Sequence, residues 1–364
     1  MNTSALFPLL LALLAGCSAA PEITGEPDEP APEATAEERA PKRSRNDEKN
    51  SPASTSDADT PAAGKKACGT ARNGVQARAL PGGQWLKRSD KLIVTPTRVI
   101  TMSRGSSGEA QSISKTTSDH YTYFYNDVDD IAVMGSDVYI LSFGRVHKAP
   151  VTGDETEVAW YGAVGGVTIV ADATDLYVGA SLGADSPLYR GAPTYDTNLF
   201  GAEPPPTWVT GPSFVALSQT AHTIYAMTYF RDNGTTVRGV SAIDKDTSAV
   251  TYLFQTEAAV REFWSDDTQT IFTSKDGVHS VPVGTLDGAD LALADDPKGL
   301  SVTADYVYFA EKGTLRRVRR DGSAPAEDLF EGDCTISALT MSDDGLYFAT
   351  DEAGRGRMFV LPRP

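Results

Sequence analysis

One short pattern is repeated seven times along most of this chain, and it constrains the fold more than any other feature. The copies at 300–308 and 339–347 align without a gap. Three further copies fit the same frame and two looser ones follow it; the seven copies end at Ile100, Tyr139, Tyr177, Tyr225, Phe272, Tyr308 and Tyr347. These positions are 36 to 48 residues apart, a period typical of proteins built from repeated units.

Each copy has the pattern of a short strand, a polar turn and a second short strand. A third strand follows, as in 277–282 and 313–318, and Asp321-Gly322 then marks a hairpin turn, because glycine tolerates positive φ. A fourth apolar run closes several copies. Four short strands about every 40 residues predict the blade of a β-propeller. We therefore predict an all-β, seven-bladed β-propeller over 68–364, with six or eight blades as alternatives.

The repeats also resemble a known group of propellers. The sequences Asp-Tyr-Val-Tyr-Phe-Ala at 305–310 and Leu-Arg-Arg-Val-Arg-Arg-Asp-Gly at 315–322 are similar to the blades of YWTD- and NHL-type propellers. The resemblance extends over 90–364 and implies the same ring architecture. YWTD propellers usually have six blades, which is why six is kept as an alternative.

The ends of the repeat array predict how the ring closes. The last copy offers three strands before the chain ends, so its fourth strand is expected from the segment 68–86. Cys68 begins that segment and Cys334 precedes the last copy, which places both at the same seam. We predict a disulfide between them, as expected in an oxidising, extracytoplasmic compartment. The alternative is a pair of free, buried thiols.

The first residues have the pattern of an export signal. Nine apolar residues at 6–14 are too few to span a membrane but fit the hydrophobic core of a signal peptide. The sequence Leu-Ala-Gly-Cys at 14–17 closely resembles the lipobox of bacterial lipoproteins. That resemblance implies a signal peptide at 1–16, lipid on Cys17 and, because Ser18 follows, the outer membrane, at its periplasmic or cell-surface face. The alternative is an ordinary secretory signal followed by a chance cysteine.

Residues 17–67 are expected to form a lipidated N-terminus and a disordered linker. From 18 to 67 there is no aromatic residue and Ile23 is the only large aliphatic one, so the segment cannot bury enough apolar surface to fold. As a loose coil it would separate its ends by about 40 Å. The whole chain has a net charge of −17, which argues against a nucleic-acid partner.

Two groups of residues are candidates for binding. An aromatic run and its counterparts in the next two copies precede first strands, where we expect them to rim the channel and contact a partner or sugar: Tyr121, Tyr123, Tyr125, Trp160, Tyr161 and Trp208. Filling of the space between blades is the alternative. Asp127, Asp129 and Asp130 supply the hard oxygen ligands that suit Ca²⁺. Turn formation without metal is the alternative for these carboxylates.

The sequence contains no coherent catalytic set, so we expect a non-enzymatic module. We predict a monomeric, lipid-anchored propeller that binds or scaffolds an envelope protein or glycan. A metal-dependent, lactonase-like propeller hydrolase is one alternative, and the aspartates above are its only support. A subunit of an envelope assembly complex is another. The known propeller lipoprotein of that kind usually carries a tryptophan after its Asp-Gly turn, and here Asp321-Gly322 is followed by serine, alanine and proline.

Overall fold

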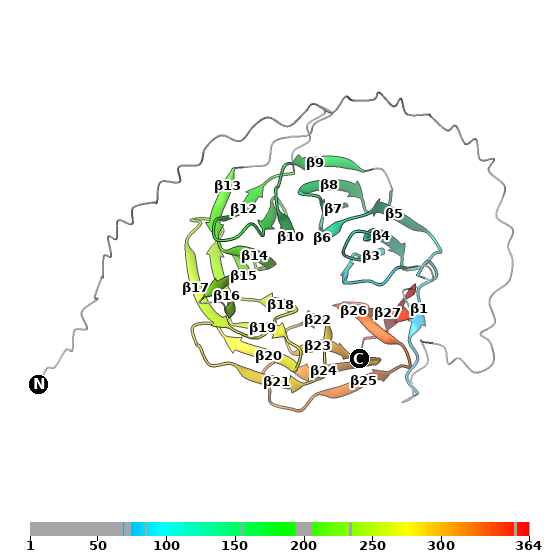
Figure 1. Cartoon of the computed structure of the whole chain (residues 1–364). Coiled ribbons are helices and arrows are strands. Elements are labelled where there is room, and N and C mark those ends of the chain that lie inside the picture. Colours follow the sequence, from blue (N-terminus) through cyan, green and yellow to red (C-terminus); the bar gives the residue numbers. More distant parts are fainter. Residues whose placement is uncertain are drawn as a thin grey trace, which may run out of the picture. The chain divides into compact units, whose positions relative to one another are not determined.

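The computed structural model of the chain describes Cys68 and residues 74–83, 86–153, 156–193, 206–232, 235–352 and 355–363. The predicted signal peptide, Cys17 and nearly all of the predicted linker lie outside these residues. The described part is built of strands and turns (Figure 1). None of its segments forms a helix of the length and hydrophobicity that crossing a bilayer requires.

Seven antiparallel sheets of four strands stand around a central axis, which confirms the predicted seven-bladed β-propeller (Figure 1). The first strands of the blades lie nearest the axis and are β2 (Lys91–Val94), β6 (Val128–Met134), β10 (Gly166–Ala171), β14 (Ser213–Gln219), β18 (Glu262–Ser265), β22 (Lys298–Val302) and β26 (Thr335–Ser342). The second strands are β3 (Arg98–Met102), β7 (Asp137–Ser142), β11 (Leu176–Ala180), β15 (Thr223–Asp232), β19 (Gln269–Thr273), β23 (Tyr306–Glu311) and β27 (Gly345–Glu352). We number the blades 1 to 7 in this order.

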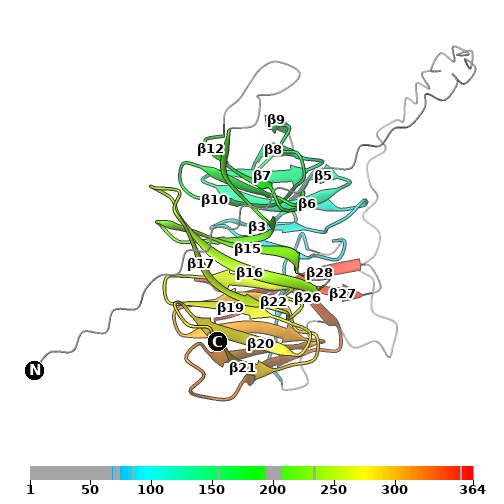
Figure 2. The same ribbon diagram turned by 60° about the vertical axis from the view of Figure 1, so that its left-hand side comes forward.

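The third and fourth strands of each blade lie progressively farther from the axis. The third strands are β4 (Glu109–Ser114), β8 (Arg145–Pro150), β12 (Ser186–Gly191), β16 (Thr235–Asp244), β20 (Gly277–Pro282), β24 (Thr314–Arg319) and β28 (Arg355–Leu361). The fourth strands of blades 1 to 6 are β5 (His120–Tyr125), β9 (Glu157–Tyr161), β13 (Thr207–Gly211), β17 (Val250–Thr256), β21 (Ala289–Leu293) and β25 (Glu327–Glu331). Figure 2 shows the same ring turned by 60°, with the four-stranded blades following one another around it.

The ring closes where the sequence predicts, at the meeting of the two ends of the repeat array. The fourth strand of blade 7 is β1 (Arg78–Ala79), which pairs with β28 through Arg78–Val360 and Ala79–Phe359. A bridge between Leu86 and Gly356 continues this contact. Although β1 is only two residues long, backbone hydrogen bonds from Leu80 to Met358 (2.9 Å) and from Met358 to Gly83 (3.0 Å) extend the pairing beyond it.

The hydrophobic core lies between the blades. The described residues form seven apolar clusters, and each cluster draws its side chains from two neighbouring blades. The cluster across the seam joins Leu80, Leu92 and Val99 to Tyr347 and Met358. Each twisted sheet therefore buries both faces against its neighbours, and blade 7 meets blade 1 as any other pair does.

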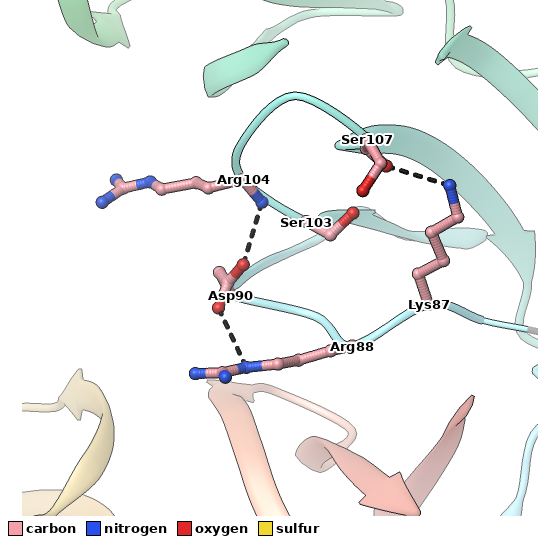
Figure 3. Close-up of a pocket in the computed structure, with 6 residues that line it drawn as sticks. All are labelled: Lys87, Arg88, Asp90, Ser103, Arg104 and Ser107. Atoms are coloured by element: carbon pink, nitrogen blue, oxygen red, sulfur yellow. Dashed lines mark hydrogen bonds and ion pairs between the residues drawn. The ribbon is translucent and has the colours of Figure 1, made fainter. Parts of the chain in front are cut away.

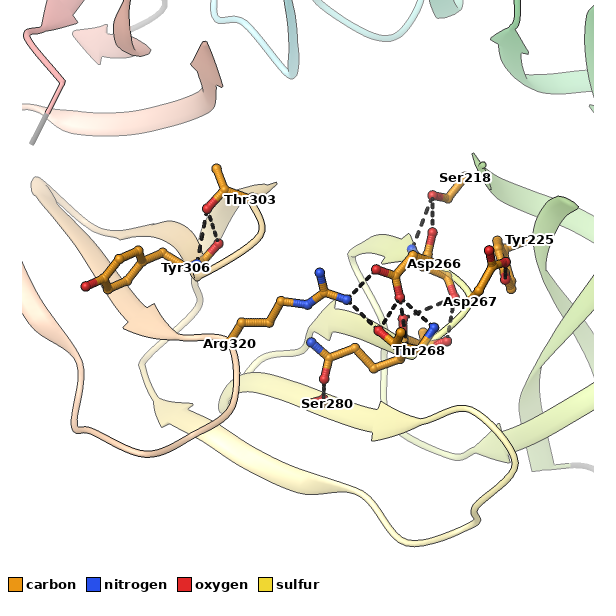
Figure 4. A network of polar contacts seen from close by, with 12 residues as sticks. Ser218, Tyr225, Asp266, Asp267, Thr268, Ser280, Thr303, Tyr306 and Arg320 are labelled. Atoms are coloured by element: carbon orange, nitrogen blue, oxygen red, sulfur yellow. Dashed lines mark hydrogen bonds and ion pairs between the residues drawn. The ribbon is translucent and has the colours of Figure 1, made fainter. Parts of the chain in front are cut away.

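Ion pairs between neighbouring blades reinforce this packing at one end of the ring. An aspartate in the turn between the first and second strands contacts a cation after the third strand of the next blade: Asp172 with Lys245 (2.9 Å), Asp266 with Arg320, and Asp344 with Lys115 (3.0 Å). Figure 4 shows the network around Asp266 and Arg320. Burial opposes ionisation of Asp172, but hydrogen bonds from Thr174, Asp175 and Lys245 outweigh it and hold its pKa below the usual value. These pairs stabilise the ring near neutral pH and weaken on acidification.

Candidate functional site

The ion pairs described above lie at one end of the ring, and the candidate sites lie at the other. In a four-stranded antiparallel blade, the turn between the second and third strands lies at the same end as the connection to the next blade. We call this end the connection face and the other end the opposite face. On the connection face lie the turns 103–108, 143–144 and 181–185 and the connections 162–165 and 294–297.

A polar cleft of about 370 Å³ opens on the connection face of blade 1. Its lining residues are Lys87, Arg88, Asp90, Ser103, Arg104 and Ser107 (Figure 3). Oδ2 of Asp90 accepts a hydrogen bond from the backbone N–H of Arg104 (2.9 Å), and Oδ1 lies 3.4 Å from Nε of Arg88. One carboxylate therefore holds the two arginine residues on either side of it.

The arginine side chains of this cleft extend toward the centre of the ring (Figure 3). Burial raises the pKa of Asp129 in blade 2 to about 6 and that of Glu262 in blade 5 to about 7. The positive charge of Arg104, which belongs to blade 1, opposes both increases. The guanidinium group of Arg104 thus acts electrostatically across the mouth of the channel.

An exposed apolar strip lies on the connection face of blades 2 to 4. Phe143, Val164 and Leu182 are 65%, 61% and 56% exposed, and Tyr229 is 39% exposed. We call these four residues the apolar rim. The turns that carry these residues lie close together. A Cβ atom added to Gly144 would lie 3.4 Å from Cα of Val164, and one added to Gly165 would clash with the Leu182 side chain. Tyr229 Oη lies 3.5 Å from Ser181 Oγ, in the same turn as Leu182. The turns that carry the rim are therefore adjacent across three neighbouring blades.

Phe143 adopts an unusual backbone conformation within this rim. It has a φ of 50° and is followed by Gly144 with a φ of 66°, which makes a tight hairpin between β7 and β8. A bulky residue at positive φ is a conformational outlier that costs on the order of 1–3 kcal/mol. Because its ring stays largely in solvent, burial offsets little of that cost.

The aromatic residues predicted to bind a partner lie in the fourth strands, at the outside of the ring rather than at the channel rim. Tyr123 and Trp160 are 5% and 1% exposed and belong to the clusters between blades, so they cannot touch a partner directly. Tyr121 and Trp208 are partly buried, and the ring centroids of Trp208 and Tyr177 lie 5.6 Å apart. The side chains of Tyr125 and Tyr161 lie outside the described part. The alternative interpretation, in which aromatic side chains fill the space between blades, explains the positions of Tyr123 and Trp160.

The three aspartates predicted as calcium ligands have different surroundings. Asp130 is 3% exposed, and its carboxylate links three inner strands through Lys91 (2.6 Å), Thr168 (3.1 Å) and the backbone N–H of Ile169 (3.0 Å). Asp129 is the carboxyl with a pKa near 6, raised by burial and then by the nearby charge of Asp127. The structure thus gives Asp130 a structural role and leaves Asp127 and Asp129 as neighbouring carboxyls on the connection face.

The two cysteines of the predicted seam form a disulfide, with Cα atoms 5.3 Å apart. Together with Glu352 they are the only group of three His, Cys, Asp or Glu side chains in the described ranges that is close enough to share a metal ion. Because the disulfide consumes both thiolates, the group serves as a cross-link in the oxidised protein.

The sequence predictions did not include the cleft arginines or the apolar rim. One signal in the repeats does mark the rim: Phe143-Gly144 occupies the hairpin position that Lys312-Gly313 fills in blade 6. Lys312 has nearly the same φ, 55°, and carries a polar side chain into solvent. An aromatic residue at a turn that another copy fills with lysine indicates a surface with a specific use.

The chain matches no protein-family model and no curated protein. Solved structures of similar fold include the extracellular domain of the putative one-component system BT4673 from B. thetaiotaomicron, with 12% identity and a TM-score of 0.59 over 80% of this chain and 43% of that one. PorZ, a surface component of the type-IX secretion system of Porphyromonas gingivalis, has 12% identity and a TM-score of 0.51 over 78% and 38%. The WD40 β-propeller domain of Doa1 has 10% identity and a TM-score of 0.52 over 77% and 96%. At these identities the similarity shows the propeller fold alone.

Proposed function

We propose that this chain is an exported, lipid-anchored propeller that binds a protein partner at the cell envelope and catalyses no reaction. The apolar rim carries the proposal. Exposed apolar side chains gathered on one face mark interaction sites, whereas scattered ones need no explanation. Phe143 strengthens the argument, because its strained backbone and solvated ring do not contribute to stability. Contact of this ring with a partner accounts for both features.

The chemistry of the rim favours a protein over a glycan. Val164 and Leu182 offer aliphatic surface without hydrogen-bonding groups, which suits the apolar anchors of a protein interface. A sugar requires hydrogen-bond donors and acceptors beside any aromatic platform, and Tyr229 is the member of the rim with a hydroxyl group. Glycan binding remains the alternative, and a glycan array probed with the same variants as below distinguishes the two.

The lipid anchor has a direct test in the bacterium that produces the protein. Cys17→Ser is expected to abolish incorporation of labelled fatty acid and to move the protein from the membrane fraction to the soluble fraction, since acylation of that sulfur supplies the anchor. Ser18→Ala is the matched control and should leave both unchanged. Fatty-acid labelling that persists in Cys17→Ser would contradict the anchor.

Partner binding is tested with charges placed in the apolar rim. Phe143→Asp and Leu182→Asp should each reduce crosslinked capture of the partner from isolated membranes at least about tenfold, because a buried, unpaired charge opposes association. Leu286→Asp is the control, since Leu286 is 80% exposed and lies beyond the rim, on the opposite face. Equal loss of capture in all three variants, or loss in none, would contradict the proposal.

Asp127 and Asp129 favour a second candidate, a metal-dependent hydrolase. Burial and the negative charge of Asp127 raise the pKa of Asp129 to about 6. A divalent cation bound between the two groups would stabilise both in their ionised form. Calorimetric titration with Ca²⁺ discriminates: stoichiometric binding that Asp129→Asn removes would favour the enzyme. A role in an envelope assembly complex would appear instead as several co-purifying subunits in the crosslinked membranes.

A further inference from the structure

The polar cleft of blade 1 has an arrangement that the apolar rim does not explain. Asp90 orients Arg88 through its side chain and Arg104 through its backbone, so the two side chains project in the same direction (Figure 3). We call Arg88 and Arg104 the arginine pair. Both residues are exposed. The Asp90 carboxylate contacts Nε of Arg88 and the backbone N–H of Arg104, and both side chains point away from the blade (Figure 3).

The arginine pair retains most of its hydrogen-bond donors. Within the part of the chain that the structure describes, the Arg104 guanidinium makes no hydrogen bond or ion pair, and Arg88 has a contact only at Nε. The other cation of the cleft is already engaged, because Lys87 pairs with Glu109 (2.6 Å) and donates to the carbonyl oxygen of Ser107 (2.9 Å). The terminal nitrogens of two arginines therefore face one opening.

Further cations surround the same mouth of the channel. Burial lowers the pKa of Lys298 in blade 6, and the charges of Arg261 and Arg88 lower it further. Asp296 offsets part of this charge by pairing with Arg261 and with Lys298 (3.2 Å). Four cations from blades 1, 5 and 6 thus lie at one end of the channel, beside the carboxyl groups of Asp296, Glu262 and Asp129.

We propose that the arginine pair binds an oxyanionic group, a carboxylate or a phosphate, at the mouth of the channel. The planar guanidinium group donates two parallel hydrogen bonds to such a group, and two of them side by side can hold one dianion. The site lies in blade 1, separate from the apolar rim of blades 2 to 4. It extends the proposed function without depending on it, because a small anion tests it in the absence of a partner.

The experiment measures saturable binding of small anions to the full chain at constant ionic strength. Citrate and inorganic phosphate represent the two sources of the group, and sulfate is the dianion whose charge is fixed. Calorimetry should give a dissociation constant on the order of 1 mM for the better ligand, as expected for two charge-assisted contacts in an open cleft. A preference for citrate assigns a carboxylate ligand, and a preference for phosphate assigns a phosphorylated one.

Variants separate the arginine pair from general positive charge. Arg104→Gln should weaken binding about tenfold, and Arg88→Gln with Arg104→Gln should remove saturable binding. Arg104→Lys keeps the positive charge but cannot donate two parallel hydrogen bonds, so it should give an intermediate affinity. Arg319→Gln is the control, since Arg319 is an exposed arginine of β24 on the opposite face. Unchanged affinity in the double variant, or no saturable binding by the unaltered chain, would overturn the proposal.

The pH dependence provides a second readout. Glu262 accepts a hydrogen bond from the backbone N–H of Gly299 (2.6 Å) and is within the electrostatic reach of Arg104 and Lys298. With its pKa raised to about 7 by burial, Glu262 loses most of its negative charge between pH 8 and 5.5. Sulfate should therefore bind several-fold more tightly at pH 5.5 than at pH 8. Tighter binding at pH 8 would contradict a site at this mouth.

Discussion

Replacing Cys334 by serine is expected to lower the free energy of unfolding of the propeller by about 3–5 kcal/mol. The disulfide joins residues 266 positions apart, so its loss releases a very long loop in the unfolded chain. It also leaves the seam without a covalent link, held by the two residue pairs of β1, the bridge from Leu86 to Gly356 and the apolar cluster between blades 7 and 1. Urea unfolding followed by tryptophan fluorescence measures the change.

The matched variants test whether the two cysteines act as one bond. Cys68→Ser should have the same effect as Cys334→Ser, and the double variant should be no less stable than either, because all three lack the same cross-link. Reduction of the unaltered protein should reproduce the loss. Additive losses in the double variant, or ready alkylation of both cysteines without reduction, would show that the thiols act separately.

Truncation of Trp160 to alanine is expected to cost about 3–5 kcal/mol, because it removes a large, fully buried side chain. The indole is 1% exposed, packs between blades 2 and 3, and donates from Nε1 to the carbonyl oxygen of Ala192 (3.3 Å). The surrounding strands belong to two sheets fixed by their own hydrogen bonds, so they cannot move together to fill the space. The midpoint of urea unfolding measures the loss.

Two further variants separate packing from binding at this position. Trp160→Phe should recover much of the lost stability, since it refills most of the cavity. Trp208→Ala should cost less than Trp160→Ala, because Trp208 is only partly buried. If Trp160→Ala kept full stability and lost partner binding instead, the buried position would be wrong and direct contact would be supported.

The fold was predictable from sequence because its signals are local and repeated. The residues that end the repeat copies, among them Tyr139, Tyr177 and Tyr347, are each at most 2% exposed, as core positions of second strands. Seven copies of one repeat and the missing strand of the last copy were enough to predict the ring, its closure and the pairing of Cys68 with Cys334. Each of these steps needs only distances along the chain.

The candidate site was less predictable because it depends on which loops share a face. The aromatic run was expected at the channel rim, but 120–125 forms β5, the outermost strand of blade 1. A pattern of alternating residues cannot tell whether a strand is the last of one blade or precedes the first of the next. Arg88 and Arg104 are 16 positions apart, and only the folded blade brings them to one carboxylate.

The position of the disulfide determines how mechanical tension would enter the domain. Cys68 is the first residue that the structure describes, and its bond leads to Cys334 in the connection between blades 6 and 7. A pull exerted from the N-terminal side of Cys68 would pass through a covalent bond into blade 7 before it reached β1. The shortest strand of the ring would therefore carry no load while the bond is intact, and reduction would let tension peel the seam open.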